Sequence, residues 1–338
     1  MSSRRGVSRV ASLVGQEIDG RYRVDSVLAR GGMGAVLRGT HLVLGQPVAI
    51  KVMLDATMRD PNLRERFLRE ARILAQVRAP TIASIFDAGL LADGTLYLVM
   101  ELLEGQSVET WLQRAGGKLP MTDALAVGFQ VLDVLDAFHK RGVVHRDIKP
   151  GNLFVTHLGV VKVLDFGLAR LRDGNGTGKA TGAGTVLGTA SYIPPEQAQG
   201  KPDQIDARSD VFAVGAVLYQ LLSGTVVHEG RSSLDRLFSA MRTPPKAISS
   251  VSSRVPIEIA AVIDKALSFD RDARHPTAKA MRDALRAAYF DVFRAPVTKP
   301  VPHVAVDVEL NESFAEPSAV VEVSFGPPPT TKPAPGLT

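Results

Sequence analysis

The chain has 338 residues, 45% of them hydrophobic and 22% charged, which predicts a packed globular core over most of its length. It contains no cysteine, so disulfides and thiolate metal sites are excluded. The net charge of +5 is mild, and the basic residues are scattered among few aromatic ones, which disfavours nucleic-acid binding.

No apolar run approaches the roughly 20 residues that a helix needs to cross a bilayer. Arg4, Arg5 and Arg9 precede only a short apolar stretch at 10–14, whereas a secretory signal needs a longer one. We therefore expect a cytoplasmic protein without a membrane span, and residues 1–17 are expected to form a disordered basic lead-in.

A strand-like run begins at Ile18 and leads into a glycine cluster that reads Ala29-Arg30-Gly31-Gly32-Met33-Gly34-Ala35-Val36. Glycines let backbone N–H groups approach phosphates without obstruction, although hairpin turns use the same residues. A strand follows the cluster, which disfavours a Rossmann site, because that site needs a helix after the glycines.

The next apolar run is strand-like and ends in Val48-Ala49-Ile50-Lys51. An amphipathic helix is predicted over 61–77, where Glu70 lies among several charges and could be an ordinary surface residue. Strands are predicted over 82–88 and 95–100. The segment Met100-Glu101-Leu102-Leu103-Glu104-Gly105 follows, and then a short helix over 107–114 and a long one over 121–141.

The central stretch reads Val144-His145-Arg146-Asp147-Ile148-Lys149-Pro150-Gly151-Asn152. Asp147 can accept a hydroxyl proton, Lys149 can bind phosphate oxygens, and Asn152 can hold a hard cation through its amide oxygen. Read alone, the stretch could equally be a polar turn that caps the preceding helix.

Strand-like runs at 153–156 and 160–164 flank a turn and lead into Asp165-Phe166-Gly167. Residues 172–184 are rich in Gly, Thr and Ala, which predicts mobility. Helices are predicted over 206–223, 233–241, 256–267 and 277–288. From about 293 the composition becomes proline-rich and acidic, which predicts a disordered tail whose valine-rich pieces could add as strands to another protein.

These stretches together resemble the protein kinases. The residues around the motifs are most similar to those of the eukaryotic-like serine/threonine kinases of bacteria. The central stretch matches H-R-D-x-K-x-x-N, and V-A-I-K and D-F-G lie before and after it in the family's order. Two places depart from the pattern, since Ala29 replaces the first loop glycine and Pro194 replaces the Ala of A-P-E. The resemblance implies an α+β bilobed fold, with a small mainly β N-lobe and a larger helical C-lobe, over 18–292.

The resemblance also implies roles for individual residues, with ATP and Mg²⁺ (or Mn²⁺) as cofactors. Asp147, Lys149 and Asn152 are expected to be catalytic, and Asn152 and Asp165 to hold the metal. Lys51 is expected to pair with the α- and β-phosphates and with Glu70. The segment 100–105 is expected to be the hinge between the lobes, where the backbone near Glu101 and Leu103 binds adenine, and Val36, Ala49 and Leu153 are expected to sandwich the adenine ring. The full set of residues expected to contact the nucleotide is Leu28, Ala29, Gly31, Gly32, Met33, Gly34, Val36, Ala49, Lys51, Glu70, Met100, Glu101, Leu103, Leu153 and Asp165.

Further roles that the resemblance implies concern support and regulation. Glu196 is expected to pair with Arg274, and Asp210 to accept hydrogen bonds from the catalytic-loop backbone. Arg146 is typical of kinases that are switched on by phosphorylation of the segment after Asp165, where Thr181 and Thr185 are the candidates.

The expected activity is therefore phosphorylation of Ser and Thr in protein substrates, with autophosphorylation in trans within a homodimer. Three other functions compete with it: a pseudokinase scaffold, a small-molecule phosphotransferase of the same fold, and a nucleic-acid binder. The pseudokinase would require loss of a catalytic residue, yet Lys51, Asp147, Asn152 and Asp165 are all present.

Overall fold

The computed structural model describes residues 10–31, 34–54, 60–75, 81–164 and 190–296. The side chains of Glu70, Ile73 and Leu74 also lie outside the description. No helix within these ranges is long and apolar enough to cross a membrane.

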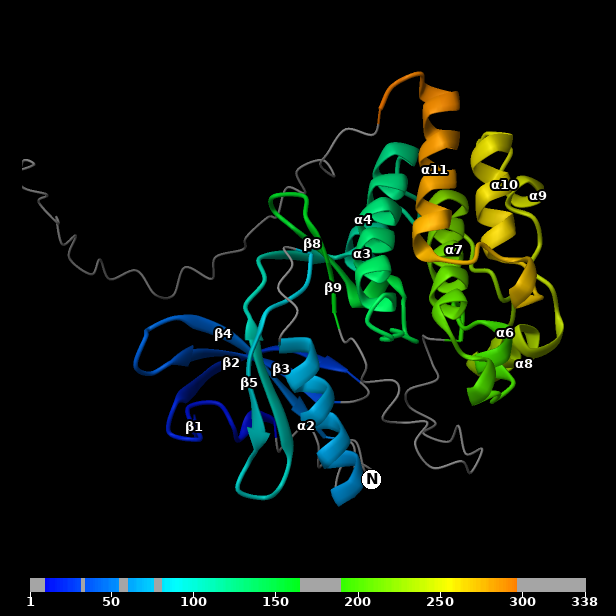
Figure 1. Cartoon of the computed structure of the whole chain (residues 1–338). Helices are drawn as coiled ribbons and strands as arrows, with labels where there is room; N and C mark the ends of the chain where they lie inside the picture. The colour runs from blue at the N-terminus through cyan, green and yellow to red at the C-terminus, as the bar shows by residue number, and fades with distance from the viewer. Residues whose placement is uncertain (1–9, 32–33, 55–59, 76–80, 165–189, 297–338) are drawn as a thin grey trace, which may run out of the picture. The chain divides into compact units, whose positions relative to one another are not determined.

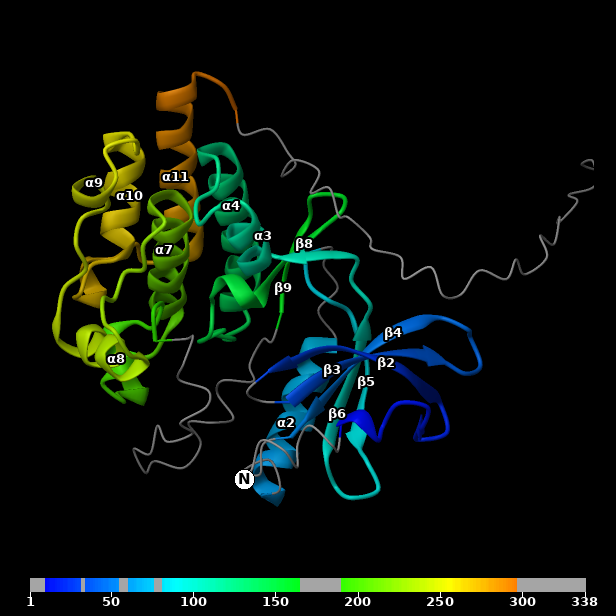
Figure 2. The ribbon, with the colours of Figure 1, turned by 180° about the vertical axis from the view of Figure 1, so that it is seen from behind.

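The N-terminal part is a six-stranded antiparallel sheet in the order β1-β2-β3-β4-β6-β5 (Figures 1 and 2). Its strands are β1 (Glu17–Ile18), β2 (Tyr22–Gly31), β3 (Gly34–His41), β4 (Pro47–Met53), β5 (Ile85–Leu90) and β6 (Leu96–Glu101). Burial alternates along β3, as expected of a strand with one face in the core, whereas β4 is buried on both faces after Pro47.

Each face of this sheet has its own apolar cluster. Helix α2 (Pro61–Ala75) contributes Phe67 and Ala71 to a cluster with Met53, Leu96 and Leu98. The other cluster includes Val24, Leu37 and Ile50. Because an apolar cluster covers each face of the sheet, β4 is apolar along its length except at Lys51 and does not alternate between apolar and polar residues.

Packing begins earlier in the chain than Ile18, where we predicted it to start. Val10 is 1% exposed and belongs to the second cluster, with Leu13 packed against it. The backbone N–H of Gly15 donates to the carbonyl of Val24 (2.9 Å). Residues 10–17 therefore differ from the predicted lead-in, because two apolar side chains and a few backbone hydrogen bonds suffice to hold them on the sheet.

A smaller antiparallel sheet has the order β7-β8-β9, formed by β7 (Gly105–Ser107), β8 (Leu153–Thr156) and β9 (Val161–Val163). Val163 makes a parallel bridge with Ile82, and its N–H donates to the carbonyl of Thr81 (3.1 Å). The hairpin β8–β9 thus contacts the segment that leads into β5.

The C-terminal part is helical. Its α-helices are α3 (Val108–Arg114), α4 (Met121–His139), α6 (Pro195–Ala198), α7 (Ala207–Ser223), α8 (Ser233–Arg242), α9 (Ile248–Val251), α10 (Ile257–Ala266) and α11 (Ala278–Phe293). Short 3-10 turns are η2 (Pro150–Asn152), η3 (Pro202–Gln204) and η4 (Arg271–Ala273).

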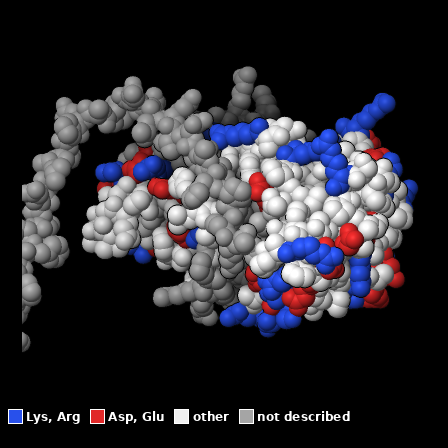
Figure 3. All heavy atoms as spheres, turned by 90° about the horizontal axis from the view of Figure 1, so that it is seen from above, with Lys and Arg blue, Asp and Glu red and all other residues white. Residues whose placement is uncertain are grey.

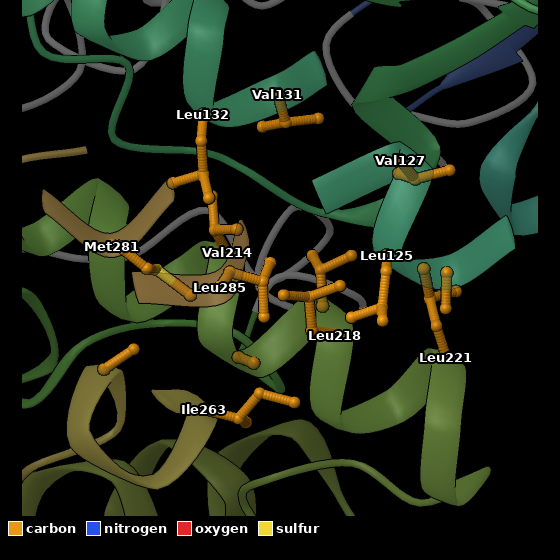
Figure 4. Close-up of a cluster of buried hydrophobic side chains, with 14 of the residues drawn as sticks. Leu125, Val127, Val131, Leu132, Val214, Leu218, Leu221, Ile263, Met281 and Leu285 are labelled. Atoms are coloured by element: carbon orange, nitrogen blue, oxygen red, sulfur yellow. The ribbon is translucent and has the colours of Figure 1, made fainter. Parts of the chain in front are cut away.

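Helix α7 is buried along almost its whole length and forms the centre of this part. Figure 4 shows side chains of α7 interdigitating with those of α4, α10 and α11, for example Leu218 beside Leu125 and Val214 beside Leu285. Asp206 caps the N-terminus of α7 by accepting from the Arg208 N–H, and Gly224 (φ 78°) ends it in the left-handed region.

Candidate active site

The catalytic carboxylate that the sequence predicts lies in a loop between α4 and η2. Lys149 Nζ donates to both oxygens of Asp147, at 3.1 and 2.9 Å. Asn152 Nδ2 donates to Asp147 Oδ2 (3.0 Å) and to the Asp147 carbonyl (2.8 Å). The structure thus brings Asp147, Lys149 and Asn152 together, because the η2 turn folds Asn152 back onto the loop.

One buried carboxylate holds the backbone just before Asp147. Asp210 is 0% exposed and lies in the first turn of α7. Its Oδ2 accepts from the His145 N–H and its Oδ1 from the Arg146 N–H, both at 2.8 Å. His139, the last residue of α4, adds a contact from Nε2 to Oδ2 at 2.8 Å. Sequence reasoning missed His139, since nothing in a helix pattern shows that its end meets α7.

His145 connects the loop to the end of β9. The His145 ring contacts the Leu164 carbonyl through Nε2 at 2.8 Å, and Nδ1 accepts from the Asp147 N–H at 3.2 Å. The ring therefore carries its proton on Nε2. Leu164 directly precedes Asp165, which lies outside the described residues, as do Phe166 and Gly167.

Lys51 lies in β4, with only 8% of its surface exposed. Its register places it opposite Val36 of β3 and Leu98 of β6. The Glu70 side chain, its predicted partner, is outside the description, so that ion pair stays a prediction.

The glycine cluster forms the end of the β2–β3 hairpin. Ala29 lies opposite Val36, and Gly31 lies opposite Gly34, while Gly32 and Met33 are outside the described residues. A Cβ on Gly34 would lie 1.9 Å from the Val52 carbonyl oxygen. Gly34 is therefore required for the close approach of β3 to β4, whatever it does toward a phosphate. Leu28 is about half exposed.

The predicted hinge contains an ion pair that sequence reasoning missed. Lys162 of β9 is 8% exposed and donates to both carboxylate oxygens of Glu101, at 2.8 and 2.7 Å, and to the Ile82 carbonyl at 3.3 Å. Glu101 also accepts from the Ser84 N–H (3.2 Å). The available signal was a lysine inside the short apolar run of β9, where a charge needs a partner.

The residues predicted to face adenine are apolar and differ in burial. Ala49 is buried, Val36 is partly buried, and Leu153 is 0% exposed within the large C-terminal core cluster. Met100 lies opposite Ala49 in the sheet, and Leu103 is partly exposed. Contact of these residues with a nucleotide stays a prediction.

The predicted pair of Glu196 and Arg274 is made in the interior. Two guanidinium nitrogens donate to the two carboxylate oxygens at 2.9 and 2.8 Å, and Ser209 Oγ donates to Glu196 at 2.6 Å. Burial alone would raise the pKa of Glu196, but the bonds and charge of Arg274, with the Ser209 hydroxyl, hold this pKa below its usual value. Arg274 also lies over the Phe212 ring at 4.8 Å.

The described part of the predicted metal site is the Asn152 amide, whose oxygen suits a divalent cation. Both Asn152 Nδ2 bonds go to Asp147, which leaves Oδ1 as the ligand end of the amide. Within the described ranges, no group of three or more His, Asp or Glu could hold a metal. The Asn152 amide and the predicted carboxylate ligand, Asp165, which lies outside the described residues, would suit a cation that takes most of its remaining ligands from phosphates and water.

The surface charge does not gather into one field on the face seen in Figure 3, where basic and acidic side chains are interspersed between uncharged stretches.

The six-stranded sheet packs against one helix, a larger helical part follows, and a loop carries a carboxylate, a lysine and an amide; this is the arrangement of a bilobed kinase fold. Residues 22–290 match the family model described as the protein kinase domain. The chain therefore belongs to the protein kinase family, which uses ATP and a divalent metal.

Similar proteins are bacterial serine/threonine-protein kinases. The probable kinase PknB of Corynebacterium glutamicum is 37% identical over 268 residues, covering 77% of this chain and 41% of its own. Pkn1 of Myxococcus xanthus is 37% identical, covering 84% and 40%. The structure of a double mutant of the Mycobacterium tuberculosis PknI kinase domain aligns with a TM-score of 0.66 and 25% identity, covering 81% and 97%. The chain spans less than half the length of PknB and Pkn1.

Proposed function

We propose that this protein transfers the γ-phosphoryl group of MgATP to Ser and Thr hydroxyls of proteins. The observation that carries the proposal is the network in which Lys149 and Asn152 both contact the Asp147 carboxylate. The names of its relatives, all serine/threonine kinases, support the choice of acceptor. A cytoplasmic location is part of the proposal, because ATP is supplied there.

In the proposed reaction, Asp147 orients the acceptor hydroxyl and takes its proton. Lys149 stands within 3.1 Å of both Asp147 oxygens, so it lies where it can donate to a phosphate oxygen beside the acceptor. Asn152 fixes Asp147 and offers Oδ1, with Asp165, to Mg²⁺. The bound ion would supply charge neutralisation at the phosphates. Catalysis is then mainly positioning and electrostatic stabilisation.

The nucleotide is proposed to lie against the end of the β2–β3 hairpin and the hinge. Lys51, held toward the phosphates by Glu70, stabilises their charge. The hairpin residues 28–34 cover the phosphates, and the backbone at Glu101 and Leu103 reads adenine between Val36, Ala49 and Leu153. The apolar character of Ala49 and Leu153 supports this placement, because ligand sites are lined mainly by apolar side chains.

The first prediction concerns Asp147→Asn, which removes the proton acceptor while it keeps the side-chain shape. We expect phosphorylation of a generic protein substrate to fall by about 100-fold or more. The melting temperature should stay within a few degrees. Initial rates with radiolabelled ATP and thermal unfolding measure both quantities.

Asp136→Asn provides a matched control, because Asp136 also contacts a lysine, Lys140 at 2.7 Å, in an i,i+4 pair within α4. This variant should keep normal activity. Near-normal rates in Asp147→Asn would contradict the assignment. A wild type that binds ATP but phosphorylates no protein would favour the pseudokinase, and transfer to small molecules alone would favour the small-molecule phosphotransferase.

The second prediction concerns regulation. Arg146 precedes Asp147, and a phosphothreonine carrying about −1.5 to −2 charges would give it a strong partner. We expect purified protein incubated with MgATP to carry phosphate on Thr181 or Thr185, through trans-phosphorylation within a homodimer. Mass spectrometry maps the sites, and a dilution series of initial rates tests the second-order step. If the segment carries no phosphate and the Thr181→Ala/Thr185→Ala double variant works like the wild type, the switch is absent.

A further inference from the structure

We propose that Gln197 is a positioning residue that fixes the peptide bond between Arg146 and Asp147, and thereby couples α6 to the catalytic loop. The inference rests on the proposed function. Gln197 Nε2 donates to the Arg146 carbonyl at 2.9 Å. Gln197 follows Glu196 directly, in a segment far from the loop in sequence.

The peptide that joins Arg146 to Asp147 is held at both of its polar ends. Its carbonyl accepts from Gln197, and its N–H donates to His145 Nδ1 at 3.2 Å. The preceding peptide is held separately, because the Arg146 N–H donates to Asp210 at 2.8 Å. Within this arrangement Gln197 is the side chain that holds the carbonyl end.

That carbonyl needs a partner because the backbone at Arg146 is strained. Arg146 has φ 68°, in the left-handed region that L-residues with a Cβ disfavour. Asp210 holds the peptide before Arg146, but the peptide after it can still rotate, which changes ψ of Arg146 and φ of Asp147 and leaves φ of Arg146 as it is. Such a rotation would turn the Asp147 carboxylate away from the acceptor, and the bond from Gln197 opposes it.

The backbone that carries the Gln197 side chain is itself held in place. Its neighbour Glu196 is bonded to Arg274 and Ser209, and the Gln197 N–H donates to the Pro194 carbonyl (3.1 Å). Gln197 Oε1 is buried and has no hydrogen-bond partner among the described residues. The donor end of the amide therefore sets its orientation. Displacement of α6 would withdraw the donor and release the strained peptide.

The test compares Gln197→Met, which keeps the length and removes the donor, with Gln199→Met. Gln199 is a matched control, because its Nε2 also donates to a backbone carbonyl, that of Met241 at 2.8 Å, away from the loop. For Gln197→Met we expect kcat on a peptide substrate to fall about 10- to 100-fold, with KM for ATP and melting temperature nearly unchanged. Gln199→Met should keep kcat, and Gln197→Lys, which restores a donor, should regain part of it.

Hydrogen exchange of the peptide covering residues 144–149 gives a readout independent of activity. It should speed up in Gln197→Met and not in Gln199→Met. A wild type without protein kinase activity would refute the proposed function, while the exchange data would still judge Gln197. Unchanged exchange and kcat in Gln197→Met would overturn the inference, and so would equal losses of kcat and melting temperature in both methionine variants.

Discussion

At the scale of single residues, the Glu196–Arg274 pair shows how much one buried contact can contribute. Arg274 has a fully buried side chain, and Glu196 and the carbonyls of Ser268 and Phe269 accept its hydrogen bonds. Removing one partner of such a pair leaves an uncompensated buried charge. The pair also holds the residue next to Gln197, so its loss should be felt at the catalytic loop.

The third prediction is that Glu196→Gln lowers the free energy of unfolding at pH 7 by about 3–5 kcal/mol. The pKa of Glu196 is lowered in the folded protein, so its stabilising contribution is fully present above the unfolded value of about 4.3. This contribution is lost as pH falls through the lowered folded pKa. The difference in the free energy of unfolding between wild type and variant should therefore become smaller below about pH 4.

Urea unfolding at pH 7 and at several acid pH values measures this difference. Asp235→Asn is a suitable control, since Asp235 is a capping residue at the exposed start of α8. A difference that stays constant with pH would show that the Glu196 charge contributes nothing.

At the scale of elements, local patterns predicted strands and helices well where one face is buried. Strand β8 spans the predicted residues 153–156, and α7 lies within one residue of its predicted start because Asp206 is a strong N-cap. Helix α11 runs to Phe293, five residues beyond the prediction, and the rings of Tyr289 and Phe293 contact each other along the added turn. The end of the long helix was predicted at 141, but α4 ends at His139.

The contacts between elements were less predictable than the elements. Motif spacing led to Asp147, Lys149 and Asn152, which the loop does bring together. It did not lead to His139, Lys162 or Gln197, because each acts through a partner distant in sequence that the quoted motifs do not include; the lysine within β9 indicated only that a partner was needed. The Glu70 side chain and Asp165 lie outside the described residues, so the motifs remain the only support for the Lys51–Glu70 pair and for the role of Asp165.

The fourth prediction concerns the ion pair that joins β9 to the hinge. Lys162→Met should lower the free energy of unfolding by about 1–3 kcal/mol, less than for a fully buried pair because Glu101 is about one-third exposed. It should also raise KM for ATP a few-fold, since Glu101 ends the strand that leads into the segment proposed to bind adenine. Denaturant unfolding and ATP titration measure the two effects.

Lys140→Met is the matched control, because the Lys140 side chain is 67% exposed in its pair with Asp136, and pairs formed by exposed lysines contribute about 0–1 kcal/mol. A double-mutant cycle of Lys162→Met with Glu101→Gln isolates the pair. A coupling free energy near zero would show that Lys162 acts through its other contacts.

At the scale of the whole molecule, the composition places the folded region before about 293, and the described residues end at 296. The last helix, α11, ends at Phe293, where Arg294 adopts φ 51° as its C-cap. Arg282 of this helix forms an ion pair with Asp133 of α4, which fastens α11 to the core. The folded domain is therefore proposed to be complete without the proline-rich tail.

The fifth prediction is that a chain ending at residue 296 keeps its melting temperature within about 2 °C and its activity on a short peptide. Chains ending at 296 and at 286 should be compared by thermal unfolding. The shorter one removes Ala288 and Tyr289 from the core cluster and should lose several degrees or fail to fold. A similar loss in the chain ending at 296 would mean that the tail docks on the domain.

Because Asp210 binds backbone N–H groups of the catalytic loop, the positions in this contact should differ in how well they tolerate substitution. Asp210 recognises the N–H groups of His145 and Arg146, which every residue except proline supplies. In a library of variants selected for activity, position 210 should therefore be nearly invariant. The loop geometry alone would let position 146 accept several side chains, with glycine and asparagine relieving the positive φ, whereas the proposed phosphothreonine switch would favour arginine there. Selection for the loop geometry would therefore constrain Asp210, whose side chain makes the contact, more strongly than Arg146, which takes part through its backbone.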